Sequence, residues 1–318
     1  MKPFRTIVTP AKAAFTISHK DRMVSIGSCF SENIGQQFAN YKFKININPF
    51  GQQYNPHSIA QAIERLIKPV PFTEGDLVLH NEQYHSLAHH GSFSKATVEE
   101  TLHGINTALL KATEDLKQAT ILFLTFGTSH VFKLKETGAT VSNCHKLPGN
   151  LFTQQLMKPE EIMEVLQTAF NKLMEINPSI KIVLTVSPVR YFAFGAYENS
   201  VSKSHLFTAV HELQQANPAL YYFPAYELVM DDLRDYRFFA DDMLHPNQQA
   251  IDYVWESLGK VLFDTNTLSL LPQIDEVLQA LNHRPRNPDS EAHKKFLERN
   301  LEKMEALKKE FGIRFYKA

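Results

Sequence analysis

The sequence contains few cysteines: Cys29 and Cys144 are the only two among its 318 residues. Two cysteines cannot form a disulfide framework. The first residues, MKPFRTIVTPAKAAFTISHKDR, carry scattered charges and lack the apolar segment of a secretory signal. We therefore expect a mature cytoplasmic chain in a reducing compartment, with both cysteines present as free thiols.

An excess of one charge and a long apolar run are also missing. The 33 basic and 34 acidic residues leave a formal charge of -1, which gives no electrostatic footprint for nucleic acid or for an anionic membrane. No apolar run approaches the roughly 20 residues that span a bilayer, so membrane insertion is not expected. With 43% hydrophobic and 21% charged residues, the composition is that of a soluble globular protein.

Four apolar runs have the length of β-strands. Two of them, ATILFLTFG and IKIVLTVSP, consist almost entirely of β-branched and large apolar residues. Such continuous runs are typical of strands that are buried on both faces of a parallel sheet. The four predicted strands are residues 22–27, 119–127, 180–188 and 220–227.

Segments with helical periodicity alternate with these strands. Asn55 followed by Pro56 is a helix-start signal, and Thr97 with Glu100 forms a capping box. The predicted helices are residues 31–41, 55–68, 97–118, 158–178, 200–218 and 245–263, with Pro246 expected to open the last one. Alternating strands and helices predict an α/β fold built on a doubly wound parallel sheet.

The composition changes near residue 270, where charged residues at helical spacing follow an RPRNPDS break. We expect one domain over residues 1–265 and a helical C-terminal extension over residues 266–318. The extension is expected to be a solvated helix packed on the same domain, and contact with a second copy in a homodimer is the alternative.

Polar residues follow the predicted strands, and parallel strands place their carboxyl ends at one edge of the sheet. The residues expected there are Gly27, Ser28, Cys29, Gly127, Thr128, Ser129, His130, Ser187 and Arg190, with Asp242 and His245 before the last helix. A thiol or hydroxyl, a histidine, a carboxylate and backbone donors are the components of nucleophilic acyl transfer.

Each component has a physical reason for its place. Cys29 follows a strand and begins a helix, where the positive end of the helix dipole favours a thiolate. Neighbouring backbone N–H groups can donate to an oxyanion. Asp242, three residues before His245, can fix the imidazole tautomer and stabilise the imidazolium. Ser28 is the alternative nucleophile, and a buried structural thiol is the alternative role for Cys29.

Other histidines and cations carry weaker signals. Cys144, His145, His89 and His90 lack the spacing of a zinc site, so we expect loops that line a pocket rather than a metal centre. His130 is expected to be a buried, hydrogen-bonded side chain. Four cations could bind an anionic group or pair with surface carboxylates: Arg190, Lys203, Arg234 and Arg237.

The segment IGSCFSENIG resembles the signature of the GSCFA family of bacterial proteins, which is placed near the SGNH (GDSL-like) hydrolases. The similarity runs from about residue 4 to 263 or beyond. Further segments that resemble the family are INPFG (47–51), LTFGTSHVF (124–132), NCHKLPGNLF (143–152), TVSPVR (185–190), SKSHL (202–206), YFPAYE (222–227) and DDLRDYRFFADDMLHP (231–246).

The relation to SGNH hydrolases implies a three-layer, flavodoxin-like parallel sheet with a serine-esterase type of site. In that register Cys29 stands in place of the nucleophilic serine and Ser28 in place of the aspartate. Gly51, with Asn48 nearby, stands at the oxyanion glycine. Gly127-Thr128-Ser129 lies over a Gly-x-Asn block, so Ser129 stands where an amide is expected. Asp242 and His245 match without change.

The expected function is therefore that of a hydrolase or acyltransferase acting on a small acyl ester, an acylated carbohydrate being one candidate. Cys29 or Ser28 attacks, His245 is the base and Asp242 orients it. Gly51, Asn48, Thr128 and Ser129 contact the oxyanion or the substrate, and His90, His145 and Arg190 line the pocket. No cofactor is required. The alternative is a ligand-binding protein that keeps the fold without efficient catalysis.

Overall fold

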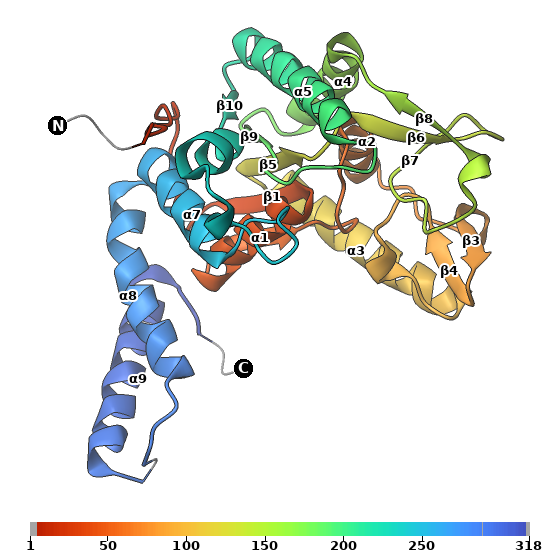
Figure 1. Cartoon of the computed structure of the whole chain (residues 1–318). Helices are drawn as coiled ribbons and strands as arrows, with labels where there is room; N and C mark the ends of the chain where they lie inside the picture. The colour runs from red at the N-terminus through yellow and green to blue at the C-terminus, as the bar shows by residue number, and fades with distance from the viewer. Residues whose placement is uncertain (1–4, 288, 316–318) are drawn as a thin grey trace.

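A five-stranded parallel sheet forms the centre of the computed structural model, which describes residues 5–287 and 289–315 (Figure 1). Its strand order is β2-β1-β5-β9-β10, which is the flavodoxin-like order 2-1-3-4-5. The expected fold class is confirmed. The strands are β1 (Arg22–Gly27), β2 (Lys44–Ile47), β5 (Ile121–Phe126), β9 (Lys181–Val186) and β10 (Leu220–Tyr222).

Successive residues of the central strands enter two separate cores, as the pleat of a strand requires. Val24 and Ile26 of β1 pack on one face, while Met23 packs on the other. The first face is covered by α2 (Pro56–Ile67), α3 (Val98–Lys117), α4 (Pro159–Ile176) and α5 (Ala196–Ala216). The second face is covered by α1 (Cys29–Asn40), α6 (Ala225–Glu227), a π-helical turn (Leu228–Leu233) and α7 (Gln248–Leu262). The molecule therefore has three layers.

The helix-start signals at Asn55 and Thr97 are confirmed, whereas the predicted starts at residues 31, 200 and 245 differ from those of α1, α5 and α7. The Asn55 side chain accepts a hydrogen bond from the Ser58 N–H at 2.8 Å, and that of Thr97 accepts one from Glu100. The last helix of the domain begins at Gln248, not at residue 245, because Asn247 is its cap. Pro246 instead forms a β-bridge with Phe239. His245 therefore lies on a loop in front of the helix.

Two small antiparallel sheets, which the strand pattern does not predict, lie beyond the carboxyl edge of the main sheet (Figure 1). One is the hairpin of β3 (Leu77–His80) and β4 (Gln83–Ser86). The other has the order β7-β6-β8, from β6 (His130–Leu134), β7 (Thr140–Val141) and β8 (Phe152–Leu156). Short 3-10 turns span Glu74–Asp76, Gly91–Phe93, Gly149–Leu151 and Tyr236–Phe238.

The C-terminal region is a pair of helices, α8 (Thr265–Asn282) and α9 (Glu291–Phe311), which extend from the side of the molecule that carries α7 (Figure 1). They share a small core of Leu270, Ile274, Val277, Leu307 and Ile313. The Tyr41 hydroxyl at the end of α1 donates to Asp275 at 2.8 Å. Within the described ranges, no helix is long and apolar enough to cross a membrane.

Candidate active site

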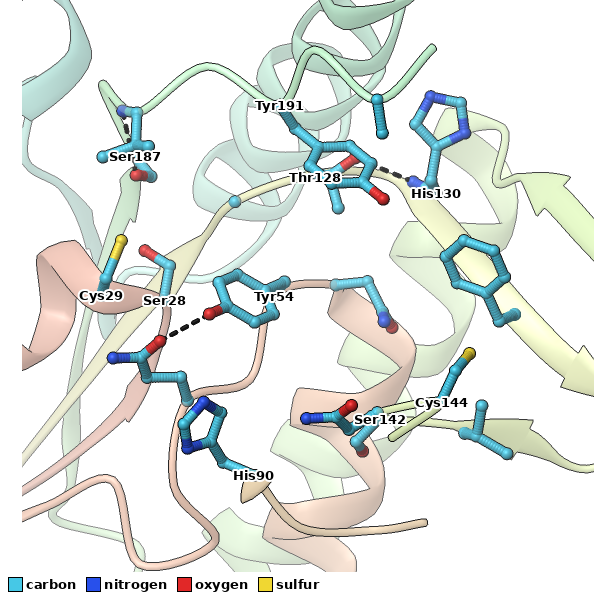
Figure 2. A pocket seen from close by; sticks show the side chains of 18 of the residues that line it. Ser28, Cys29, Tyr54, His90, Thr128, His130, Ser142, Cys144, Ser187 and Tyr191 are labelled. Atoms are coloured by element: carbon cyan, nitrogen blue, oxygen red, sulfur yellow. Dashed lines mark hydrogen bonds between the residues drawn. The ribbon is translucent and has the colours of Figure 1, made fainter. Parts of the chain in front are cut away.

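A cavity of about 1040 Å³ opens at the carboxyl edge of the sheet (Figure 2). The strand order reverses between β1 and β5, and such a switch point is where α/β sheets bind ligands. The ends of β1, β5 and β9 form its floor, and the β6–β8 sheet forms a wall. It brings together ten of the residues expected at the sheet edge or in the pocket loops: Ser28, Cys29, His90, Gly127, Thr128, His130, Cys144, Ser187, Arg190 and His245.

The Gly27-Ser28-Cys29 turn is fixed by close backbone packing. A Cβ atom on Gly27 would lie 2.6 Å from the carbonyl oxygen of Thr125, so only glycine fits there. Ser28 precedes α1 and is 2% exposed, whereas Cys29 is the first residue of the helix and is half-buried. Figure 2 shows the two side chains together on one wall of the cavity. Cys29 is the more accessible of the two candidate nucleophiles.

Opposing influences act on the Cys29 thiol. Burial raises its pKa above the ordinary value, and this effect dominates. The backbone N–H groups of Phe30 and Cys29 and the charge of Lys203 lower the pKa, while Glu32 raises it. The thiolate is thus favoured by the helix start and by a lysine, but it is opposed by the apolar surroundings.

His245 and Asp242 form the expected pair. Nδ1 of His245 lies 2.5 Å from Oδ2 of Asp242, and Oδ1 of Asp242 accepts the N–H groups of Leu244 and His245 at 2.9 Å. Those two backbone donors, with the imidazole, lower the pKa of Asp242 to about 2. The Asp242 carboxylate therefore fixes the Nδ1–H tautomer, so Nε2 of His245, on the cavity wall, is available as a base.

Arg190 holds this turn in place from the loop after β9. Its Nη2 donates to the carbonyl oxygen of Met243 at 2.8 Å, and its guanidinium lies over the rings of Phe192 and Phe239. Met243 has a positive φ of 58°, as a sharp turn requires. Arg190 is thus tied to the His245 turn and also lines the cavity.

Asn55 brings a side-chain amide to the cavity that the motif comparison does not reveal. Its Oδ1 caps α2, while its Nδ2 donates to no other described residue and the side chain lines the cavity. The preceding carbonyl, of Tyr54, accepts the N–H groups of Gly127 and Thr128 at 2.8 and 3.0 Å. Asn55 is therefore held firmly beside the strand ends and offers a free donor.

Residues 22–258 match the GSCFA family, and residues 274–315 match the C-terminal domain of GSCFA domain proteins. The chain belongs to the GSCFA family. No curated protein matches the chain. The resemblance inferred from the IGSCFSENIG segment is thereby confirmed, and the second match covers most of the α8–α9 pair.

Several solved structures resemble this GSCFA protein at a distance. A proposed platelet activating factor from Streptococcus pneumonia shares 12% identity over 76% of this chain and 84% of that chain, with a TM-score of 0.39. A family 3 carbohydrate esterase from Talaromyces cellulolyticus shares 8% identity over 79% of this chain and 97% of that chain, with a TM-score of 0.38. The periplasmic domain of a lipopolysaccharide acetyltransferase from Salmonella ser. Paratyphi A shares 10% identity over 77% of this chain and 84% of that chain, with a TM-score of 0.36.

Two residues expected at the oxyanion do not reach the cavity of this GSCFA protein. The N–H of Gly51 is already donated to the carbonyl of Asn48 at 2.7 Å, and the Gly51 Cα packs against His90. The Asn48 side chain instead accepts the N–H of Gly27 at 2.9 Å. Both residues build the turn after β2 and do not supply the expected oxyanion contacts.

Ser129 is likewise wrongly placed by the motif comparison. It is fully buried, and its hydroxyl and its N–H both bond to Ser202 of α5. Thr128 does line the cavity, although its hydroxyl also bonds to Ser202 at 2.9 Å. The Gly127-Thr128-Ser129 segment therefore anchors α5 and contributes only Thr128 to the cavity wall.

Of the four residues expected in the pocket loops, His90 and Cys144 line the cavity, whereas His89 and His145 do not. The Nε2–H of His145 donates to the Ser86 carbonyl oxygen at 2.9 Å, away from the cavity. His89 is buried among phenylalanine rings, and burial lowers its pKa to about 3, so it stays neutral. Within the described ranges, no group of three or more His, Cys, Asp or Glu side chains is placed to hold a metal.

His130 is buried as expected, with Nδ1 2.8 Å from the Gln154 amide, and it lies on the cavity wall. Burial lowers its pKa, and its Nε2 is buried without a partner. The remaining cations fall elsewhere. Arg234 and Arg237 are exposed and away from the cavity, whereas Lys203 is completely buried next to its floor.

Proposed function

We propose that this GSCFA protein is an SGNH-type hydrolase or acyltransferase that uses Cys29 as a covalent nucleophile. One observation carries the proposal: Cys29 opens a helix inside a cavity that it shares with a histidine paired to a carboxylate. A nucleophile, a base and a group that orients the base are what acyl transfer needs. Ser28 is the second candidate nucleophile, but its hydroxyl is buried.

The reaction follows from these groups. His245 accepts the Cys29 thiol proton through Nε2, and the sulfur adds to the ester carbonyl carbon. The resulting oxyanion is stabilised by the backbone N–H of Cys29 and by Nδ2 of Asn55, which takes the role expected of Gly51 and Ser129. The carbon–oxygen bond to the alcohol then breaks, and His245 returns the proton to the alcohol. Water or an acceptor hydroxyl cleaves the thioester by the same steps in reverse.

The cavity supports a substrate larger than a simple acetyl ester. Its volume of about 1040 Å³ lies at the upper end of small-molecule sites. Aromatic rings of Phe152, Tyr191 and Phe192 line it beside polar side chains such as Gln154 and Asn143. Flat rings next to hydrogen-bonding groups suit an acylated sugar, which presents apolar C–H faces and hydroxyl groups.

The alternative function is ligand binding without efficient catalysis. It is supported by the raised pKa of Cys29, because a protonated thiol is a poor nucleophile. The two functions differ in one observable. An enzyme forms a thioester at Cys29, whereas a binding protein leaves the ester intact.

The test is the burst of p-nitrophenol from p-nitrophenyl acetate before steady state. We expect the wild type to release about one equivalent, since each molecule forms one thioester. Cys29→Ala and His245→Ala should abolish the burst, and Ser28→Ala should retain it. Cys144→Ala removes the second thiol of the cavity and should leave the amplitude at one equivalent.

Two results would contradict this proposal. A burst that disappears with Ser28→Ala but persists with Cys29→Ala would move the nucleophile to the serine. No burst from the folded wild type, with an ester this small and activated, would favour the ligand-binding alternative.

A further inference from the structure

Lys203 lies in an environment that is unusual for a lysine. It is 2% exposed on the face of α5 that packs on the sheet. Its ammonium donates to the carbonyl oxygen of Gly127 at 2.7 Å and to that of Ser187 at 2.6 Å. These carbonyls belong to residues just past the ends of β5 and β9, so the positive charge sits directly below the cavity floor.

No carboxylate among the described residues forms an ion pair with Lys203. Buried charges are normally paired, because an isolated ammonium loses its hydration. Two neutral carbonyl groups satisfy part of its hydrogen-bonding capacity but supply no negative charge. An apolar side chain would fill the same space at lower cost, so the charge needs another explanation.

Four ionisable groups surround the site. Gly127, whose carbonyl oxygen holds the ammonium, packs against Ser28, the neighbour of Cys29, since a Cβ on Gly127 would lie 3.5 Å from the Ser28 Cβ. Cys29 is therefore close to Lys203, and the charges of the two groups act on each other. The ring of Tyr226 lies 5.9 Å from the ammonium. Glu32 and Tyr54 interact with the Cys29 thiol, and neither acts on the lysine. The group able to supply the opposite charge for Lys203 is therefore Cys29.

We propose that Lys203 is the counter-ion of the Cys29 thiolate, held beneath the cavity by the Gly127 and Ser187 carbonyl groups so that negative charge on the sulfur is stabilised before it attacks. The inference rests on the proposed function, whose nucleophile it concerns. Lys203 is a positioning residue: it does not exchange a proton with the substrate and does not form a bond to it.

The counter-ion explains how a nucleophile can work in an apolar cavity. Burial opposes the thiolate, and the lysine offsets that effect. Since burial lowers the pKa of Lys203 itself to about 7, its support is strongest at neutral and lower pH. The support should fade as the lysine loses its proton.

The test is the rate at which iodoacetamide alkylates Cys29 between pH 5.5 and 10, in a Cys144→Ser background with a single thiol. We expect Lys203→Met to lower the alkylation rate below pH 7, where the wild-type lysine carries its proton, because the opposite charge beside the thiolate is lost. The rate near pH 6.5 should fall about tenfold, and the rates should converge toward pH 10, where the wild-type lysine is neutral. Glu32→Gln removes a like charge and should raise the rate.

A folded Lys203→Met protein that keeps the wild-type alkylation rate near pH 6.5 would overturn the inference. The reciprocal measurement needs no substitution at Lys203: the NMR titration of its ¹³Cε signal should shift to lower pH in Cys29→Ala, and an unchanged titration would also overturn it. Neither readout uses an ester. The inference can therefore fail while the p-nitrophenol burst is present, and it can hold while the burst is absent.

Discussion

The buried Lys203 should make the stability of the protein depend on pH in a way that a single substitution removes. A lysine has an ordinary pKa of 10.5, and burial lowers the pKa of Lys203 to about 7. Between these values the unfolded chain binds more protons than the native state, so the free energy of unfolding rises with pH. The cost of the buried ammonium is fully present below pH 7 and is lost as the pH rises to 10.5.

The size of the effect follows from the same two values. One pKa unit corresponds to about 1.4 kcal/mol. The full cost below pH 7 is therefore about 5 kcal/mol, and about 2 kcal/mol of it is relieved between pH 7 and pH 9. Lys203→Met also leaves the Gly127 and Ser187 carbonyls without a donor, which costs about 1–3 kcal/mol each at every pH. The pH dependence, not the absolute stability, is the decisive quantity.

Urea unfolding at pH 7, 8 and 9, followed by circular dichroism, measures this quantity. The wild type should gain about 2 kcal/mol over this range relative to Lys203→Met, with similar m-values. Lys260→Met, at an exposed position of α7, is the matched control and should keep the wild-type dependence. Parallel curves for the wild type and Lys203→Met would refute the reasoning.

Three further predictions concern the site and its scaffold. Asp242→Asn should slow the burst at least about 100-fold, because the amide cannot fix the imidazole as the carboxylate does. Since the pKa of Asp242 is about 2, its titration should not change the burst rate of the wild type above pH 4. Asn55→Asp keeps the helix cap but loses the Nδ2 donor, so the burst rate should fall about 10²–10³-fold with an unchanged melting temperature. Gly27→Ala should destabilise the protein by about 1–3 kcal/mol in thermal unfolding, because the new Cβ would clash with Thr125, whereas Gly104→Ala, with open space around it, should stabilise α3 by up to about 1 kcal/mol.

The parallel sheet is predictable from the sequence because its central strands are buried on both faces. Residues 119–127 and 180–188 are continuous apolar runs, and β5 and β9 lie inside them. β2 is not predictable in this way, since KINI is short and half-exposed at the sheet edge. The strands of the β7-β6-β8 sheet mix polar and apolar residues and depend on each other for pairing.

The candidate site is predictable where the local sequence fixes it. Cys29 begins the helix, with one residue between it and the end of a strand, and Asp242 pairs with His245 within one turn. Gly51 and Ser129 are misplaced because a motif does not reveal which N–H groups other parts of the chain already use. The position of the Asn55 amide in the cavity and the burial of Lys203 depend on contacts between segments that are distant in the sequence. The residues adjacent to Asn55 and Lys203 in the sequence do not reveal these contacts.

The cavity wall is built from a different part of the chain than the reacting groups. Cys29, Asn55 and His245 are carried by the start of α1, the start of α2 and the turn before α7, while much of the wall comes from residues 130–154, between β5 and α4. The proposed reacting groups and the residues that would contact the substrate therefore lie largely on separate segments of the chain. If the proposed function holds, exchanging the segment between β5 and α4 for that of another GSCFA protein should change the substrate preference and leave the proposed acyl-transfer groups in place.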